Sequence, residues 1–543
     1  MSIRKQMRSD YLPERLPTSL RRERVSRTKF GGLAGEGIHD MTNLSPRCAP
    51  ALATRMARGL YVSAFGSGTP HGMTFFDGHL FFARGTRLYR TKEGESVLDM
   101  GAVSDTDKQF FVFGDRLYIY PDKLYVEKGG GMPVYVELDT GVIEQVSFQG
   151  KKATLPEGMG WTALGFRPGD GLRIVNADDA EPAPEGYYRI AEIHGREVSV
   201  VGSFPSTYVS NACFRRTVPA LERVCVSGNR VYGVMGQDVY ISAAGSALDF
   251  YSKGATDGSD PVILHTDTDG AFTACTPWQG YVIFFKSDRI CRLMGSRSDS
   301  FSLSDMSAVG LPARLANTLC EVAGTLFYCT DGGVYRYRGQ EPERIAPAGD
   351  SVATSGYGGT DGYAYYVAVE RGADSWWQYL YLPDVGEWYA EDGIHPTCMI
   401  RRDGYLCLQD SDGYIWLTSS DGRRTGCSFD ERHLRGEVEA SVMLAPDYGL
   451  QPDGCRLTAV FIRATGGAGA EMEVLASYSD GQTGKDIDGT EEISLGKFKG
   501  KMTDRLLRIP VTPRLCDGVR IRLVMTGAWV IHSVIREYER GGR

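Results

Sequence analysis

A short pattern of apolar positions recurs through the middle of the chain. Each copy has a turn glycine, then four or five mostly apolar residues, then a second short apolar segment that often contains tyrosine. Two copies are Gly78-His79-Leu80-Phe81-Phe82 with Leu88-Tyr89, and Gly324-Thr325-Leu326-Phe327-Tyr328 with Val334-Tyr335. Short apolar runs bounded by glycine turns predict β-strands. The copies begin at seven glycines, which are Gly78, Gly114, Gly228, Gly280, Gly324, Gly362 and Gly404.

The spacing of these glycines indicates how the strands are grouped. Successive glycines are 36, 114, 52, 44, 38 and 42 residues apart. All but one of these intervals are close to the ~40–50 residues of a β-propeller blade. A single blade cannot cover both of its apolar faces, whereas blades packed around an axis cover one another. We therefore expect an all-β chain in which residues 34–428 form a propeller of six to eight blades.

Two segments do not follow the blade pattern. The interval of 114 residues is about 65 residues too long for one blade, and residues 146–206 within it hold several short strands and glycine turns of their own. We expect a small β-barrel inserted at this point. After residue 428 the strands become longer and alternate between apolar and polar positions, as in Leu457 to Ile462 and Val519 to Met525. Residues 429–543 are therefore expected to form a C-terminal β-sandwich or jelly roll.

Composition and charge narrow the class of protein. Hydrophobic residues make up 42% of the 543 residues, which excludes a disordered chain. The net charge of −8 argues against a general nucleic-acid coat. Residues 1–30 nevertheless carry a charge of +6, which leaves −14 for the rest. Residues 1–33 thus read either as a solvated leader or as a basic arm that docks onto a negative surface through Arg21, Arg22, Arg24, Arg27 and Lys29.

The location of the protein is also suggested by the sequence. The opening residues Met1 to Gln6 lack the apolar core of a secretory signal, and no apolar run approaches the ~20 residues of a membrane helix. We expect a soluble protein made in a cytoplasm, without membrane insertion. Cys320 and Cys329, like Cys398 and Cys407, lie nine residues apart around a turn. Cross-strand disulfides are one interpretation, and buried thiols are favoured for a chain made in a cytoplasm.

Candidate chemistry is sparse. We find no nucleophile elbow, zinc-protease motif or phosphate-binding loop, so we expect no enzyme and no cofactor. Of the eight histidines only His71 and His79 are near each other, and a metal pair there is the less favoured interpretation. The runs Asp267-Thr268-Asp269-Gly270 and Asp410-Ser411-Asp412-Gly413 lack the spacing of an EF-hand loop. Side chains that close β-turns explain them better.

Several segments, in order, resemble the tail stabilisation, hub or nozzle proteins of bacteriophages, also known as tail tubular proteins. The opening is similar in Lys29-Phe30-Gly31-Gly32-Leu33, followed by Asn43-Leu44-Ser45-Pro46 and the run from Pro50 to Arg55. The stretch Asp331-Gly332-Gly333-Val334-Tyr335-Arg336-Tyr337 is similar to a blade signature of that family. Ile509-Pro510, Arg514-Leu515-Cys516-Asp517 and Ile531-His532-Ser533 resemble its C-terminal domains.

This resemblance implies a structural protein of the virion tail, made in a bacterial host. Proteins of this kind form homo-oligomeric rings, usually hexamers, below the portal and adaptor. They contact other tail proteins, and double-stranded DNA leaves through the ring without specific binding. An acidic body fits such a conduit because it repels the phosphates. The inserted domain departs from the better-known members, so hub and distal nozzle are both open.

A second interpretation is a receptor-binding or glycan-binding propeller. Trp376, Trp377 and Trp388 could stack on sugar rings. The same side chains are equally suited to the core of a blade or to an interface with another subunit, which we favour.

Overall fold

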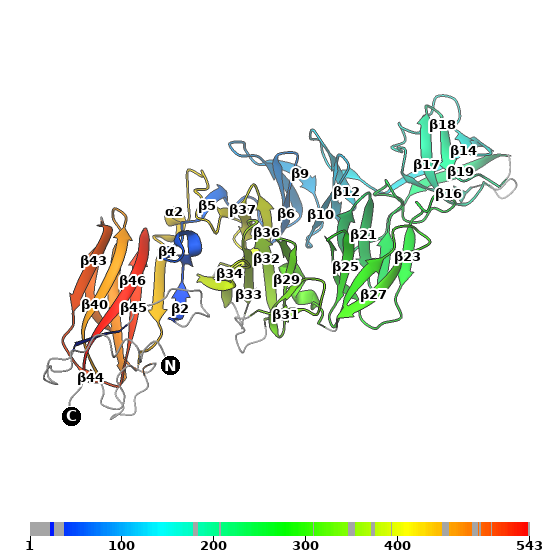
Figure 1. The fold of residues 1–543 in the computed structure, drawn as a ribbon. Coiled ribbons are helices and arrows are strands. Elements are labelled where there is room, and N and C mark those ends of the chain that lie inside the picture. Colours follow the sequence, from blue (N-terminus) through cyan, green and yellow to red (C-terminus); the bar gives the residue numbers. More distant parts are fainter. Residues whose placement is uncertain are drawn as a thin grey trace.

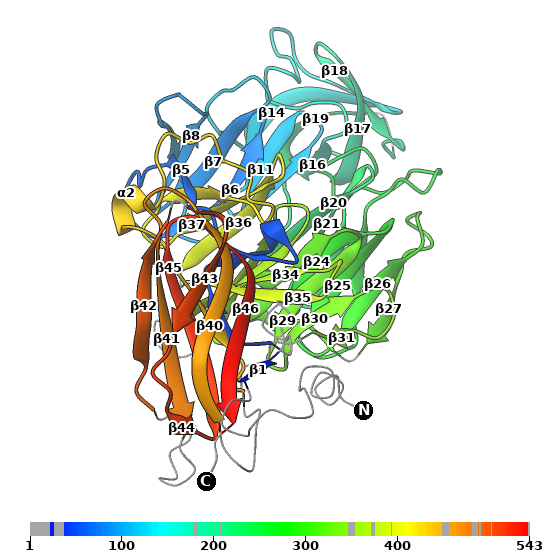
Figure 2. The same ribbon diagram turned by 60° about the vertical axis from the view of Figure 1, so that its left-hand side comes forward.

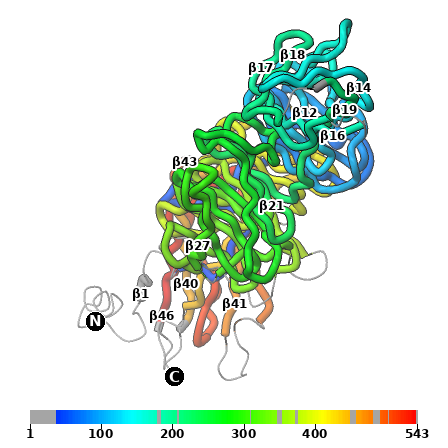
Figure 3. Tube along the Cα trace, turned by 90° about the vertical axis from the view of Figure 1, so that its right-hand side faces the viewer, coloured from blue at the N-terminus to red at the C-terminus, as the bar shows by residue number. Residues whose placement is uncertain are grey.

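The computed structural model describes residues 22–25, 37–177, 183–205, 208–307, 309–345, 353–370, 375–392, 394–447, 455–479, 487, 490–500 and 502–540. The chain is an elongated all-β molecule with three parts (Figure 1). A propeller occupies the middle, a two-sheet domain lies at one end, and a small barrel projects beyond the other (Figures 1 and 3). No helix in these ranges is long and apolar enough to cross a membrane.

The described residues of the middle part form seven antiparallel sheets of four strands each. Sheet 1 consists of β6 (Pro70–Phe76), β7 (His79–Arg84), β8 (Arg87–Thr91) and β9 (Leu98–Ala102), and sheet 2 of β10 (Gln109–Phe113), β11 (Arg116–Tyr120), β12 (Leu124–Glu127) and β13 (Val134–Tyr135). Sheet 3 consists of β20 (Arg223–Ser227), β21 (Arg230–Met235), β22 (Asp238–Ile241) and β23 (Val262–His265), and sheet 4 of β24 (Phe272–Trp278), β25 (Tyr281–Lys286), β26 (Ile290–Met294) and β27 (Ser302–Ser307). Sheet 5 consists of β28 (Cys320–Val322), β29 (Thr325–Thr330), β30 (Gly333–Tyr337) and β31 (Glu343–Arg344). Sheet 6 consists of β32 (Ser355–Thr360), β33 (Tyr365–Glu370), β34 (Trp376–Leu382) and β35 (Glu387–Glu391). Sheet 7 consists of β36 (Pro396–Arg402), β37 (Tyr405–Asp410) and β38 (Ile415–Thr418) together with β5 (Gly59–Val62).

The first strands of these sheets pack side by side around an axis. β6 contacts β10, β10 contacts β20, β20 contacts β24, β32 contacts β36, and β36 returns to β6. Between β24 and β32 the ring is continued by η3 (Ala313–Thr318), a 3-10 turn that leads into β28. The ring is closed by β5, because this strand from the N-terminal part of the chain pairs with β38. The predicted all-β propeller is therefore confirmed.

The repeating glycines have a common place in this architecture. Each of the seven lies in the turn between the first and second strands of its sheet and has positive φ. At Gly78 φ is 73°, and the preceding Asp77 also has positive φ, at 48°. Two consecutive residues with positive φ favour the tight hairpins in which glycine is common. A side chain at Gly78 would meet no atom within 4 Å, so backbone conformation and not space requires the glycine.

The inserted domain is a closed six-stranded barrel that lies between sheets 2 and 3 in sequence. Its strand order is β14-β15-β18-β17-β16-β19, and its core includes Trp161, whose ring lies 4.7 Å from that of Phe214. The barrel predicted for residues 146–206 is present, but its strands span residues 138–216, since β14 and β19 are long strands that pair with each other. The strands are β14 (Leu138–Gln149), β15 (Lys152–Thr154), β16 (Gly171–Asn176), β17 (Gly186–His194), β18 (Glu197–Val201) and β19 (Tyr208–Arg216).

The two-sheet domain combines both ends of the chain. One sheet has β3 (Leu44–Ser45), β4 (Leu52–Thr54), β46 (Trp529–Arg540), β40 (Cys455–Gly466) and β43 (Met502–Pro510), with β1 (Arg22–Val25) paired to β46 and β44 (Leu515–Cys516) to β40. The other has β2 (Ile38–Thr42), β39 (Glu439–Leu444), β45 (Gly518–Thr526), β41 (Glu471–Ser479) and β42 (Ile493–Lys499). The short turns η2 (Pro46–Cys48) and α2 (Arg432–Arg435) lie in the connections.

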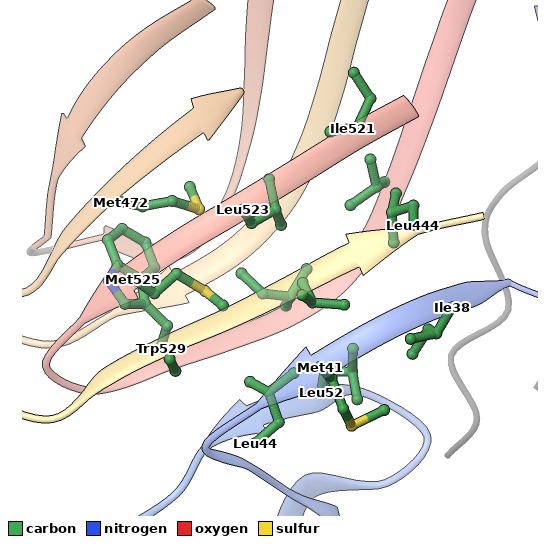
Figure 4. Packing of buried hydrophobic residues seen from close by; sticks show 14 of the residues in the cluster. Ile38, Met41, Leu44, Leu52, Leu444, Met472, Ile521, Leu523, Met525 and Trp529 are labelled. Carbon is green, nitrogen blue, oxygen red and sulfur yellow. The ribbon is translucent and has the colours of Figure 1, made fainter. Parts of the chain in front are cut away.

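This arrangement corrects the expected domain boundaries at the N-terminal end. The propeller was expected to begin at residue 34, but residues 38–54 pair with strands of the two-sheet domain, and the propeller begins at β5. Figure 4 shows the physical reason. Ile38, Met41, Leu44 and Leu52 pack into the same buried cluster as Trp529 and other side chains of the C-terminal strands. Because these strands are short, their apolar positions do not reveal which distant sheet they join.

Candidate functional site

A cavity of about 290 Å³ lies where the first strands of the sheets converge. Its wall is built from residues in or next to these strands, so most of the sheets face a common space. Six of the strands contribute directly, and η3 contributes in place of β28. The polar side chains in the wall include His71, Asp107, Gln109, Arg223, Asn317, Tyr357 and Thr397.

His71 lies at the wall of this cavity between two carboxylates. Its Nε2 is 2.7 Å from Oδ1 of Asp105, and its Nδ1 is 3.2 Å from Oδ1 of Asp107. The histidine side chain is buried, whereas both aspartates are largely exposed. Lys108, next in sequence, is buried and forms an ion pair of 2.7 Å with Asp122, so its charge is neutralised within the protein. Arg223 in the same wall donates to the side-chain oxygen of Asn317 at 3.3 Å.

Two further ionisable groups of the wall, Tyr357 and Cys398, are uncharged at neutral pH. Burial raises the pKa of Tyr357 to about 12 and that of the Cys398 thiol to about 11, and the nearby Asp107 carboxylate acts in the same direction. A nucleophilic thiolate needs a lowered pKa. The wall therefore offers neutral hydrogen-bonding groups at these two positions, without an activated nucleophile.

The histidines and aspartate runs take structural roles. His79 contacts the backbone of its own turn at Asp77, and strand pairing places it opposite Phe76, at the far end of β6 from His71. In the described part of the chain, no three His, Cys, Asp or Glu side chains are arranged to hold a metal ion. Asp410 accepts hydrogen bonds from the Tyr414 backbone at 2.9 Å and from Trp416 Nε1 at 2.8 Å, so it closes a turn as expected.

The second aspartate run also serves the propeller frame. The carbonyl oxygen of Thr268, between Asp267 and Asp269, accepts a hydrogen bond of 2.7 Å from Lys286 Nζ. Lys286 is fully buried, and its Nζ also donates to the hydroxyl oxygens of Thr266 and Thr268, so this turn provides the acceptors that a buried charge requires.

The junction between propeller and two-sheet domain holds a buried network of arginines and carboxylates, which we call the arginine clamp. Its members are Arg55, Arg58, Glu391, Asp392 and Glu431. Both arginines and Glu431 have side chains no more than 5% exposed. Every carboxylate of the clamp contacts at least one arginine, as a buried charge requires.

The positions of these residues explain what the clamp joins. Arg55 and Arg58 lie where the chain passes from β4 into β5, and Glu431 lies where it returns from the propeller to β39. Glu391 is the last residue of β35 in sheet 6, and its Oε2 accepts from Arg58 Nη2 at 2.7 Å. Asn43, between β2 and β3, adds a backbone hydrogen bond of 2.9 Å to Ala390 of β35. The clamp thus holds both chain crossings and one propeller sheet together.

The electrostatics of the clamp favour the ionised forms of Asp392 and Glu431. The neighbouring Arg58 and Arg55 guanidinium groups lower the pKa of Asp392 to about 2, against the opposing effect of burial. The same arginines hold the pKa of Glu431 below its ordinary value, again against burial. The carboxylates of Glu431 and Asp392 in turn raise the pKa of Arg58. A buried network of this kind fixes geometry, and it breaks at a high cost when one member is removed.

The three candidate tryptophans fall into different environments. Trp388 is 2% exposed and packs against Tyr381 at 4.7 Å between ring centroids, so it belongs to the propeller core and cannot contact a ligand. Trp376 is partly buried and stacks on His395 at 4.2 Å. Trp377 is 46% exposed, which leaves it as the one member of the three with a largely open ring.

The candidate docking arm is only partly within the described residues. Arg22 and Arg24 lie on β1, opposite Glu539 and Glu537 of β46 in the antiparallel register (Figure 2). Arg21, Arg27 and Lys29 lie outside the described residues. The strand pairing of residues 22–25 was not predicted, because three charged residues and a single valine carry no apolar pattern that would indicate a strand.

Among the exposed large apolar side chains, two groups are close together in sequence, one on the propeller rim and one at its junction with the two-sheet domain. The β13 surface consists of Met132, Val134 and Tyr135, which are 59%, 48% and 71% exposed. The α2 surface consists of Phe429 and Leu434, which are 59% and 50% exposed. β12, which pairs with β13, lies toward the barrel, whereas α2 lies beside the two-sheet domain (Figure 1). Exposed apolar clusters are typical of contact surfaces.

Comparison with known proteins adds little beyond the architecture. No protein family and no curated protein matches the chain. Solved structures that it resembles include BamB from Moraxella catarrhalis, with 11% identity over 73% of this chain and 97% of that one, at a TM-score of 0.33. AztD from Citrobacter koseri has 13% identity over 66% of this chain and 94% of its own, also at 0.33. Hsv2 from Kluyveromyces lactis has 8% identity over 60% and 97%, at a TM-score of 0.27.

Proposed function

We propose that the protein is a structural component of a bacteriophage tail, and that copies of it form a ring, of six subunits, below the portal and adaptor. Genomic DNA would leave through this ring. The observation that carries the proposal is a pair of joined domains with two different exposed apolar surfaces. The arginine clamp joins the propeller to the two-sheet domain, and the β13 and α2 surfaces lie apart on this pair of domains.

Cyclic assembly requires such a pair of surfaces. Each subunit of a ring contacts its two neighbours through different patches, so one patch must fit the other. The angle between the patches sets the number of subunits, and that angle is constant only if the domains do not move against each other. The clamp supplies this constancy, since Arg55, Arg58 and Glu431 are buried and paired across both chain crossings.

The remaining features agree with a conduit. In this proposal the propeller has seven blades, closed by β5, and the two-sheet domain is a β-sandwich that mediates contacts with other tail proteins. The chain outside residues 1–30 carries a charge of −14, which repels DNA phosphates instead of retaining them. We assign the protein no catalytic activity and no cofactor, and place it in the virion tail after synthesis in a bacterial cytoplasm.

Cryo-electron microscopy of particles from a producing culture tests the proposal. We expect the chain to trace into an axial ring below the capsid, with the β13 surface of one subunit against the α2 surface of the next. A location on peripheral fibres, or absence from purified particles, would overturn it.

Receptor or glycan binding is the second candidate, and the exposed ring of Trp377 is the observation in its favour. A glycan array with the wild-type chain and with Trp377→Ala separates the two functions. Tyr135→Ala, which changes another exposed aromatic residue, is the matched control. Specific binding that Trp377→Ala alone removes would favour the second candidate.

A further inference from the structure

Two cysteines from neighbouring sheets meet beside the central cavity. Cys225 lies in the middle of β20, and Cys275 lies in the middle of β24. These are the first strands of sheets 3 and 4, and they contact each other. Cys225 belongs to the apolar cluster between these two sheets, together with Val282 and Phe284, and Cys275 packs against the same cluster. The two side chains therefore occupy one interface.

The two thiols lie near each other in that interface, because β20 and β24 pack together and both side chains belong to or contact the same cluster. A side-chain hydrogen bond with Cys275 is the largest cause that raises the pKa of Cys225, ahead of burial. A thiol neighbour exerts this effect only at short range. The residues are 50 positions apart in sequence, and no spacing rule identifies such a pair, because the packing of two different sheets brings it together.

The pair is asymmetric in its access to solvent. Cys275 is partly exposed and lines the central cavity, whereas Cys225 is 8% exposed and shielded by the cluster. A small solute that enters the cavity thus reaches Cys275 first and meets Cys225 only through it. This is the arrangement in which one cysteine is oxidised and a second one resolves the product.

We propose that Cys225 and Cys275 form a modification site, at which a peroxide generates a disulfide that links sheets 3 and 4. Hydrogen peroxide oxidises the Cys275 thiol to sulfenic acid, and its O–O bond breaks with release of one water. The Cys225 sulfur then attacks the Cys275 sulfur, the S–O bond breaks, and the hydroxyl leaves as a second water with the Cys225 proton. Two thiols lose two electrons in total, and one peroxide gains them.

The cysteine pairs suggested by sequence spacing provide matched controls. Strand pairing places Cys320 opposite Phe327 and Cys329 opposite Val334, so these two are not cross-strand partners. Likewise Cys398 is opposite Gln409, and Cys407 is opposite Ile400 on the same strand pair. A disulfide requires facing Cβ atoms about 3.5–4.5 Å apart, which this register does not favour.

Peptide mapping tests the proposal on the full-length protein. The purified chain is treated with hydrogen peroxide, remaining thiols are alkylated, and trypsin digestion is followed by mass spectrometry. Cleavage places Cys225 on the peptide from Val224 to Arg230 and Cys275 on that from Gly254 to Lys286, each with a single cysteine. We expect these two peptides to be linked, the link to be lost with dithiothreitol, and the oxidised chain to unfold about 5 °C higher.

Single variants make the test specific. With Cys225→Ala we expect no linked peptide and a Cys275 sulfenic acid that dimedone labels, because the resolving thiol is gone. With Cys275→Ala we expect Cys225 to stay reduced, since its access is through Cys275. The proposal is overturned if the wild-type chain shows Cys275 oxidised without the link, or if both thiols remain alkylatable. Linkage of the Cys320 and Cys329 peptides under the same conditions would also contradict it, because oxidation would then not follow the structural pairing.

Discussion

Arg58 and Glu431 form an ion pair inside the protein although 373 residues separate them in sequence. Arg58 Nη1 donates to Glu431 Oε2 at 3.1 Å, and the Arg58 backbone N–H donates to Oε1 at 2.8 Å. One residue lies where the chain enters the propeller and the other where it leaves. The contact therefore joins the two connections between propeller and two-sheet domain, and the position of one domain relative to the other depends on it.

Removal of one clamp member should loosen this junction. Glu431→Gln removes the one buried carboxylate that contacts both Arg55 and Arg58 and leaves them only the half-exposed Asp392 in common. We expect a loss of about 3–5 kcal/mol of stability, as for other broken buried pairs. Thermal unfolding and limited proteolysis measure the effect, with new cleavage expected near residues 419–438. Asp99→Asn, which removes the partner of the exposed Arg87, is the control and should change little. Equal effects of the two substitutions would contradict a structural role for the clamp.

The clamp also predicts a dependence of stability on acid. Because the pKa of Asp392 is lowered to about 2 in the folded protein, its contribution is present above its ordinary pKa of 3.8 and is lost as pH falls toward 2. The lowered pKa of Glu431 acts in the same direction. Unfolding temperatures measured between pH 5 and pH 2 should fall more steeply for the wild type than for Asp392→Asn. Parallel curves would show that Asp392 does not contribute.

Substitution of two tryptophans of sheet 6 should have different effects on the stability of the protein. Trp388→Ala removes a buried ring and should cost about 3–5 kcal/mol. Trp377→Ala changes a side chain that is 46% exposed and should cost less than about 1 kcal/mol. Chemical denaturation of the two variants provides the comparison. A large loss for Trp377→Ala would mean that its ring supports the blade and is not a contact residue.

Ring formation should depend on both apolar surfaces. Tyr135→Asp and Phe429→Asp each place a charge in a surface that the proposed assembly buries, so we expect loss of oligomers without a change in unfolding temperature. Light scattering or mass photometry of the purified chain measures the assembly. Val385→Asp, at another exposed apolar position, is the control. Oligomers that persist in both surface variants would exclude these contacts.

The basic arm should matter for attachment more than for folding. Deletion of residues 1–28 removes β1, which adds four residues to the edge of a sheet that already holds β46, β40 and β43. We expect the shortened chain to keep its propeller and its unfolding transition but to be missing from purified particles. Normal incorporation of the shortened chain would refute a docking role for the arm.

The repeat could be found in the sequence because its signal is local. A glycine with positive φ and two adjacent strands recur within each sheet, so Gly78 and its six counterparts mark the sheets directly. The N-terminal strands could not be assigned, since Ile38 and Leu52 find their apolar partners in strands more than 390 residues later. The arginine clamp could not be predicted from the sequence for the same reason. Nothing near Arg58 in sequence indicates a carboxylate partner, and only the folded topology supplies Glu431.

The closure of the ring by β5 also sets the order in which the protein can be completed. β5 leaves the ribosome early, yet its partner β38 ends at Thr418, more than 350 residues later. At roughly 5–20 residues per second, the last sheet waits about 20–70 s for its fourth strand. During that time sheets 1 to 6 can form in sequence. β3 and β4 can pair with each other, but β2 must wait for β39 and β4 must wait for β46. A nascent chain that stops before β38 therefore exposes unpaired edges at both of its ends, and we expect truncated products to be captured by chaperones or degraded.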